Sequence, residues 1–190
     1  MATSSAVVPV HIALQQMAAF RGISSQTASL LAMACQAVRL PANRKLFDQG
    51  EPGSSMVIVA EGMLRLEQID AATRQMTAIG NIQHGEFIGE MALLQPEPRA
   101  ARGVAATDAL VYLITPERFA ALESDAPEAA CALINAITRN LTRRIRKVED
   151  LAAKLAPQTL PEPTPLDPVT AAVAGERSAI GKLWAKLTKN

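Results

Sequence analysis

Aromatic residues are scarce in this chain: Phe, Tyr and Trp make up 3% of its 190 residues, whereas hydrophobic residues make up 49%. A buried core must therefore be aliphatic, and a chain of this length fits one domain with appendages. Neither sign of charge is in excess, because the chain has 19 Lys and Arg and 18 Asp and Glu. This balance lacks the overall basic excess that indicates a nucleic-acid-binding protein.

Cysteines and long apolar runs are also few. Cys35 and Cys131 lie far apart, without the pair spacing of a metal site or a disulfide framework. We expect both to be buried reduced thiols, which agrees with a cytoplasmic protein. No run approaches the roughly 20 apolar residues of a membrane span, and the first ten residues lack the charged and apolar regions of a signal peptide. We find no nucleophile–base pair, metal cluster or P-loop, so we expect no enzymatic activity.

The segment 86–101 has the features of a phosphate pocket. An apolar run is interrupted by a Gly-Glu step, and a short helical turn is followed by Pro98 and Arg99. A bound phosphodiester needs matching donors, exposed backbone N–H groups and little side-chain bulk. Glu90 would repel a phosphate, so its carboxylate makes sense as the acceptor for a sugar hydroxyl. Alternatively, Glu90 and Arg99 pair with each other in a solvated loop, which contributes about 0 to 1 kcal/mol.

The spacing Ile-Gly-Glu-Met-Ala-Leu, four residues, Pro-Arg-Ala-Ala resembles the phosphate-binding cassette of the cyclic nucleotide-binding domain family, which includes catabolite activator protein and protein kinase A regulatory subunits. In that family the glutamate holds the ribose 2′-hydroxyl and the arginine pairs with the cyclic phosphate. The resemblance places these roles on Glu90 and Arg99, with the backbone of Gly89 and Ala100 completing the cradle. The full predicted ligand-binding set is Ile88, Gly89, Glu90, Met91, Ala92, Arg99, Ala100, Ala101 and Arg144.

The apolar periodicity predicts an α+β fold, in which a small β-roll or barrel lies between N-terminal helices and a long C-terminal helix. The resemblance implies that the strands form a jelly-roll-like β-roll. Residues 1–40 form the helical lead-in, with a second helix over 23–38, and residues 41–126 form the β-roll. Within the roll we expect a strand over 56–59, a turn at Gly62 and a hairpin partner over 63–66.

The long helix is expected over 127–156. Apolar residues recur every seven positions, which predicts a coiled-coil seam and a possible homodimer. Arg144 interrupts this seam. In transcription factors of the family the equivalent helix forms the dimer interface and covers the base. The positions of the polar pair that contacts the base in those proteins correspond to Arg144 and Ile145 here. Arg144 therefore either contacts a purine or extends from a shallow seam into solvent. The seam residues are Ile134, Ile137, Leu141, Val148, Leu151 and Leu155.

The C-terminal part divides into a linker, 157–168, and a tail, 169–190. Five prolines predict a semi-rigid linker. The tail is too short for the helix-turn-helix domain of the transcription factors, so we do not expect DNA binding. Its apolar face, flanked by lysines, would dock on a protein partner, an acidic membrane surface or the chain's own domain. This face contains Ile180, Leu183, Trp184 and Leu187.

Together these features indicate a cytoplasmic, non-enzymatic receptor that binds a cyclic nucleotide and signals through its C-terminal helix and tail. We expect cAMP ahead of cGMP, because Ala101 stands where cGMP-preferring relatives often have a hydroxyl that meets the guanine amino group. The alternative is a ligand-independent interaction scaffold with a degenerate pocket, or one that takes a cyclic dinucleotide.

Overall fold

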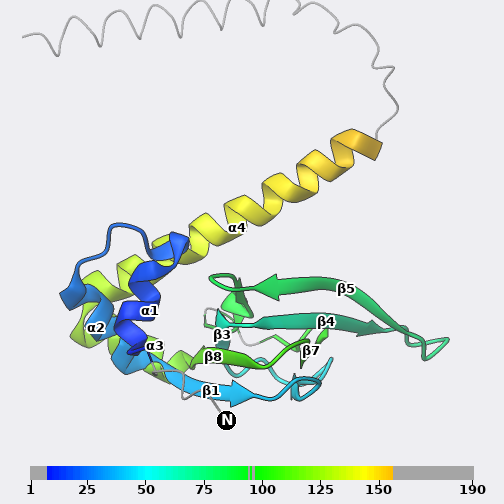
Figure 1. Cartoon of the computed structure of the whole chain (residues 1–190), viewed down its shortest axis with the longest axis horizontal. Coiled ribbons are helices and arrows are strands. Elements are labelled where there is room, and N and C mark those ends of the chain that lie inside the picture. Colours follow the sequence, from blue (N-terminus) through cyan, green and yellow to red (C-terminus); the bar gives the residue numbers. More distant parts are fainter. Residues whose placement is uncertain (1–7, 94, 96, 156–190) are drawn as a thin grey trace, which may run out of the picture. The chain divides into compact units, whose positions relative to one another are not determined.

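The computed structural model describes residues 8–93, 95 and 97–155, and the fold lies in the first of two units, Met1–Glu149. The predicted α+β class is confirmed: helices flank antiparallel strands (Figure 1). In chain order the elements are α1 (Val10–Gln16), the 3₁₀ helix η1 (Ala18–Phe20), α2 (Ser25–Ala34), β1 (Gln36–Leu40), β2 (Lys45–Phe47), β3 (Met56–Glu61), β4 (Met63–Ile69), β5 (Met76–Gln83), β6 (Phe87–Ile88), the 3₁₀ helix η2 (Glu90–Leu93), β7 (Arg102–Ala105), β8 (Ala109–Ile114), α3 (Pro116–Asp125) and α4 (Pro127–Leu155).

The strands form two four-stranded sheets, ordered β1-β8-β3-β6 and β2-β7-β4-β5. One aliphatic cluster draws residues from both sheets, including Val57 and Val59 of β3 and Leu64 and Leu66 of β4. Successive strand residues point to opposite faces. The alternate β3 residues, such as Ile58, therefore enter a second cluster with the helices. Burial on both faces explains why β3 reads as a continuous apolar run.

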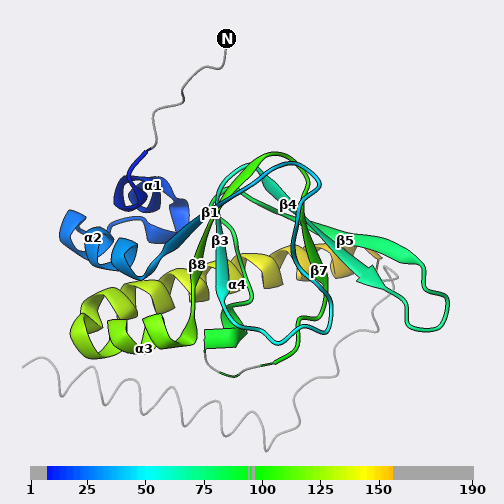
Figure 2. The same cartoon turned by 90° about the horizontal axis from the view of Figure 1, so that it is seen from below.

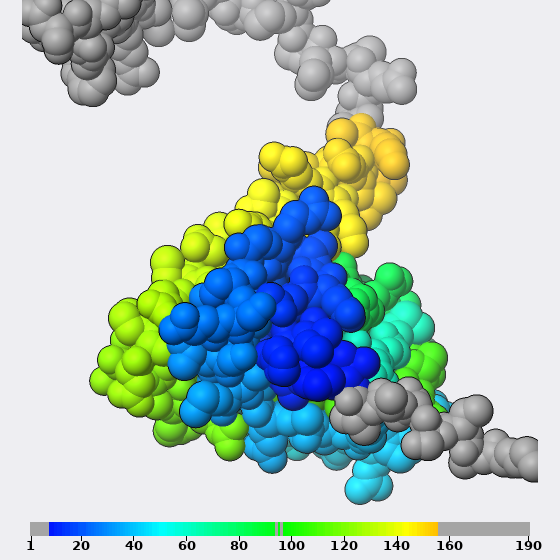
Figure 3. All heavy atoms as spheres, turned by 60° about the vertical axis from the view of Figure 1, so that its left-hand side comes forward, coloured from blue at the N-terminus to red at the C-terminus, as the bar shows by residue number. Residues whose placement is uncertain are grey.

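The helices cover one face of the first sheet (Figure 2). Leu14 and Phe20 of the N-terminal segment pack with Leu133 of α4 in the second cluster, and the Phe20 ring lies 5.5 Å from that of Phe87 in β6. On the surface, the N-terminal helices form a continuous layer with α3 and the beginning of α4 (Figure 3). The strand β6, which leads into the predicted cassette, is thus packed directly against the helical layer.

The second helix is shorter than we expected, because α2 ends at Ala34 and residues 36–38 belong to β1. Cys35 adopts an extended conformation, and β1 pairs antiparallel with β8 from Gln36 opposite Leu113. The tertiary pairing thus overrides the apolar spacing that favoured a longer helix. The expectation that both cysteines are buried is wrong for Cys131, which is exposed on α4, and holds only in part for Cys35, which is half-buried. Desolvation raises the pKa of the Cys35 thiol to about 12.

The predicted hairpin of residues 56–59 with 63–66 is also wrong. Gly62 has φ +74° and makes the expected turn, but β3 pairs with β8 and β6, while β4 pairs with β5 and β7. The turn therefore carries the chain from one sheet into the other. Adjacent apolar runs predict two strands without showing which sheet each joins.

Helix α4 runs over Pro127–Leu155, and its first half packs against the roll through Ala129, Leu133 and Ala136. Of the predicted seam, Ile134, Val148, Leu151 and Leu155 are exposed. A homodimer through these residues stays a prediction, and the predicted linker and tail lie outside the described residues. Among the described helices, none combines the length and apolar character that a membrane-spanning segment needs.

Tyr112 offers a test of the core packing. The side chain is fully buried in β8, and its hydroxyl has no hydrogen-bond partner among the described residues. Because an unpaired buried hydroxyl costs about 1–3 kcal/mol, Tyr112→Phe should raise the free energy of unfolding by about 1 kcal/mol. Urea denaturation would measure this change. A Tyr112→Phe variant that unfolds at a lower urea concentration than the wild type would show that the hydroxyl makes a stabilising hydrogen bond.

Candidate functional site

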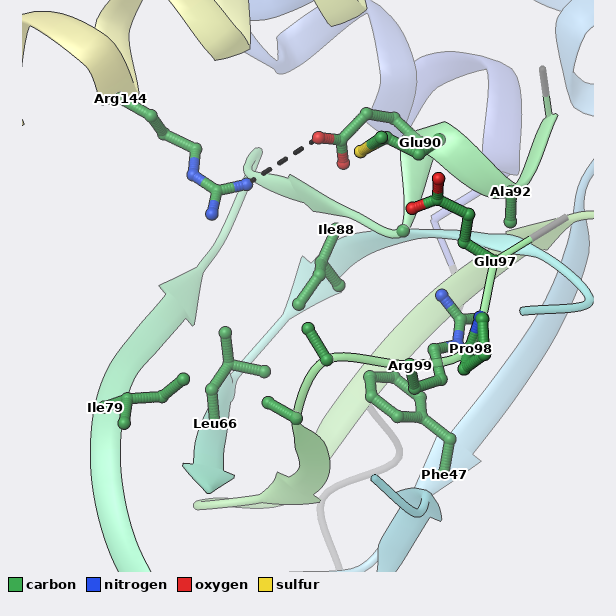
Figure 4. Close-up of a pocket in the computed structure, with 14 residues that line it drawn as sticks. Phe47, Leu66, Ile79, Ile88, Glu90, Ala92, Glu97, Pro98, Arg99 and Arg144 are labelled. Carbon is green, nitrogen blue, oxygen red and sulfur yellow. Dashed lines mark ion pairs between the residues drawn. The ribbon is translucent and has the colours of Figure 1, made fainter. Parts of the chain in front are cut away.

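A cavity of about 260 Å³ lies where the second sheet, the cassette segment and α4 meet (Figure 4). All nine residues of the predicted ligand-binding set line it. Whether they bind a ligand stays a prediction, but the fold brings together the cassette and Arg144, which are far apart in sequence. The sequence reasoning did not assign five other lining residues, namely Phe47, Leu66, Ile79, Glu97 and Pro98.

The backbone around Arg99 is held by a neighbouring loop. The Arg99 carbonyl accepts a hydrogen bond from the Gly50 N–H at 2.8 Å, and the Arg99 N–H donates to the Glu51 carbonyl at 2.8 Å. An isolated bridge pairs Pro52 with Pro98. This antiparallel pairing fixes the backbone from which the Arg99 side chain extends. The position of the guanidinium therefore does not depend on the cassette loop alone.

The Arg99 side chain is 9% exposed and is oriented from two sides. Its Nη2 donates to the Ser55 carbonyl at 2.6 Å, and its guanidinium carbon lies 4.5 Å from the centroid of the Phe47 ring. Burial lowers the pKa of Arg99, and the charges of Glu51 and Glu90 oppose this shift. A preoriented, partly desolvated guanidinium is suited to bind a phosphate, because its fork of N–H donors matches two oxygens.

Gly89 allows this arrangement. It follows β6 with φ +73°, and an added Cβ would fall on Arg99 Nη1 and lie 3.0 Å from the Ser55 carbonyl oxygen. The positive φ favours glycine. A side chain at this position would force the Arg99 guanidinium to move. Both the backbone conformation and the present position of Arg99 therefore favour glycine in the Gly-Glu step that the sequence singled out.

Glu90 begins η2 and has two carboxylate oxygens in different surroundings. Its side chain points into the cavity, and Oε1 lies 3.9 Å from Nη1 of Arg144 (Figure 4). Oε2 is fully buried and has no hydrogen-bond partner among the described residues. The alternative in which Glu90 pairs with Arg99 is not observed, since the ion pair of Glu90 is with Arg144. An unsatisfied buried acceptor is costly, and a ligand hydroxyl in the cavity would satisfy it.

Helix α4 is held next to the cassette by polar contacts. Asn140, which is 1% exposed, donates from Nδ2 to the Phe87 carbonyl at 3.4 Å. Lys147 Nζ lies 3.4 Å from Glu86 Oε1. These contacts flank Arg144 and bring it to the cavity. In the part of the chain that the structure describes, no group of three His, Cys, Asp or Glu side chains could hold a metal ion.

The helix-covered β-roll thus contains a cavity that brings a Gly-Glu turn next to a buried arginine. Residues 37–125 match the family model of the cyclic nucleotide-binding domain. This match confirms the resemblance predicted from the cassette.

Individual relatives agree with this assignment. The chain is 23% identical over 134 residues to the CRP-like cAMP-activated global transcriptional regulator of Mycobacterium tuberculosis, covering 70% of this chain and 58% of that protein. It is 29% identical over 122 residues to the cyclic AMP receptor protein of Thermus thermophilus, covering 64% and 56%. The chain thus matches little more than half the length of these relatives. A cyclic nucleotide-binding domain from Methylobacillus flagellatus superposes with a TM-score of 0.67 at 19% identity, covering 80% of this chain and 85% of that chain, and shows the fold alone.

Proposed function

We propose that the chain is a receptor that binds a cyclic mononucleotide in the cavity between the cassette and α4. The observation that carries this proposal is the pairing, in one cavity, of the preoriented Arg99 cation with the buried, unsatisfied Oε2 of Glu90. The guanidinium and the backbone N–H groups near Gly89 and Ala100 bind the cyclic phosphate. Glu90 accepts the ribose 2′-hydroxyl.

The base occupies the aliphatic part of the cavity, which is lined by Leu66, Ile79, Ile88 and Ala101. cAMP is the first candidate because two relatives carry cyclic AMP in their names. In addition, Ala101 offers no hydroxyl to the amino group of guanine. cGMP and a cyclic dinucleotide are the alternatives.

The output of binding is proposed to pass through α4, whose polar contacts tie it to the cassette, and through the tail to a protein partner. The exposed seam of α4 would serve a homodimer, and the basic amphipathic tail would also suit an acidic membrane surface. We place this receptor in the cytoplasm and assign it no enzymatic role.

Titration calorimetry of the full chain with cAMP, cGMP, cyclic di-GMP and 5′-AMP tests the proposal. We expect a saturable isotherm for cAMP with one site per chain, weaker binding of cGMP, and no heat with 5′-AMP, whose second phosphate charge exceeds what Arg99 neutralises. Failure of all three cyclic ligands to bind would overturn the proposal and favour the ligand-independent scaffold.

A further inference from the structure

Arg144 lies at the cavity but faces a carboxylate. Figure 4 shows the Arg144 side chain extending from α4 toward Glu90, while Ile79, Ile88 and Leu66 line the adjoining part of the cavity. We propose that Arg144 is a positioning residue that acts on the nucleotide through Glu90: it holds the carboxylate so that Oε2 receives the ribose 2′-hydroxyl. This inference rests on the proposed function and replaces a direct contact of Arg144 with the base.

The division of labour between the two oxygens of Glu90 supports this role. Oε1 lies 3.9 Å from Arg144 Nη1, which is within reach of an ion pair but too long for a hydrogen bond. Oε2 is buried without a partner. A carboxylate that is drawn to a cation through one oxygen has lost rotational freedom, so its other oxygen is already oriented when a hydroxyl arrives. Positioning of this kind lowers the entropic cost of binding.

The place of Arg144 is set by its own helix. Asn140, Arg144 and Lys147 are four and three residues apart, so they share one face of α4. Asn140 is bound to the Phe87 carbonyl, and Lys147 pairs with Glu86. Both partners belong to the segment that leads into Gly89 and Glu90. The helix face is therefore held on each side of Arg144 by contacts that do not depend on a ligand.

The burial of Glu90 supports the carboxylate, rather than the base, as the partner of Arg144. The Arg144 side chain is 42% exposed, whereas that of Glu90 is 11% exposed. Because Glu90 is the more buried of the two, the loss of its neighbouring cation would leave a desolvated carboxylate with less compensation. Solvent screens the charge of the more exposed Arg144, so we expect that its removal lowers the affinity only moderately.

The test compares cAMP with one ligand that differs from it only at the sugar and one that differs only at the base. Affinities of the full chain for cAMP, cGMP and 2′-deoxy-cAMP are measured by calorimetry for the wild type and for Arg144→Met. We expect Arg144→Met to lose roughly three- to tenfold in affinity for both cAMP and cGMP, and less than about twofold for 2′-deoxy-cAMP. Arg144→Lys should recover part of the loss, because the positive charge is kept.

Two further variants separate positioning from general damage. Arg146→Met removes a cation from an exposed position of α4 that does not line the cavity, so it should not alter the ratio of affinities for cAMP and 2′-deoxy-cAMP. In a Glu90→Gln background, Arg144→Met should have little additional effect, because the group that it positions is gone.

A loss that is equal for cAMP and 2′-deoxy-cAMP, or that appears with only one base, would overturn the inference and leave the proposed function intact. A wild-type chain that binds none of the three ligands would overturn the proposed function, and the inference with it.

Discussion

Arg99→Ala should lower the affinity for cAMP by at least about 100-fold, because charge-assisted hydrogen bonds to a phosphate contribute about 1.5–3 kcal/mol each and the guanidinium supplies two. The Arg99 side chain is already oriented by the Ser55 carbonyl and the Phe47 ring, so little freedom is lost when the ligand binds. Calorimetry with the wild type and the variant would measure the difference.

Two variants serve as controls for this loss. Arg99→Lys keeps the charge without the planar fork and should bind at an intermediate level. Arg102→Ala removes an arginine three residues away that pairs with Asp48 and does not line the cavity, so it should bind cAMP as the wild type does. Arg99→Ala binding within threefold of the wild type would contradict the assignment of the phosphate site.

Gly89→Ala should reduce cAMP binding by about 10- to 100-fold, because one methyl group would displace the Arg99 guanidinium that supplies two charge-assisted bonds. The residue has φ +73°, which costs a non-glycine residue roughly 1–2 kcal/mol. We therefore expect a lower free energy of unfolding as well, measurable by urea denaturation. The affinity and the stability would fall together but for separate reasons, one steric and one conformational.

Gly80→Ala is the matched control for Gly89→Ala. Gly80 lies in β5, and an added Cβ there would meet no heavy atom within 4 Å. This variant should keep both the stability and the affinity close to those of the wild type. If Gly89→Ala binds cAMP as well as Gly80→Ala does, the cavity around Arg99 is not the phosphate site.

The local parts of the structure were accessible from the sequence, whereas the pairing of distant parts was not. The cassette and the long helix α4 are continuous segments with their own spacing, so their residues could be assigned directly. The ends of α2 and β1 depend on β8, which follows more than sixty residues later, and the partners of β3 and β4 depend on the closure of two sheets. Apolar periodicity carries no information about such partners.

The same reason explains what the sequence reasoning missed in the site. Phe47, Leu66 and Ile79 come from three strands of the second sheet, and as aliphatic or aromatic strand residues they looked like ordinary core. Glu97 and Pro98 lay inside the recognised cassette and could have been included. Arg144 was placed at the cavity by the resemblance, but its ion pair with Glu90 appears only when α4 is packed on the roll.

The central claim is that this cavity is the nucleotide site, and an amide NMR titration of the full chain with cAMP tests it most directly. We predict that the largest chemical-shift changes occur at Gly89, Glu90, Ala100 and Ala101, with saturation at one equivalent and no such changes in Arg99→Ala. Shift changes that lie elsewhere, or that persist unaltered in Arg99→Ala, would contradict the account.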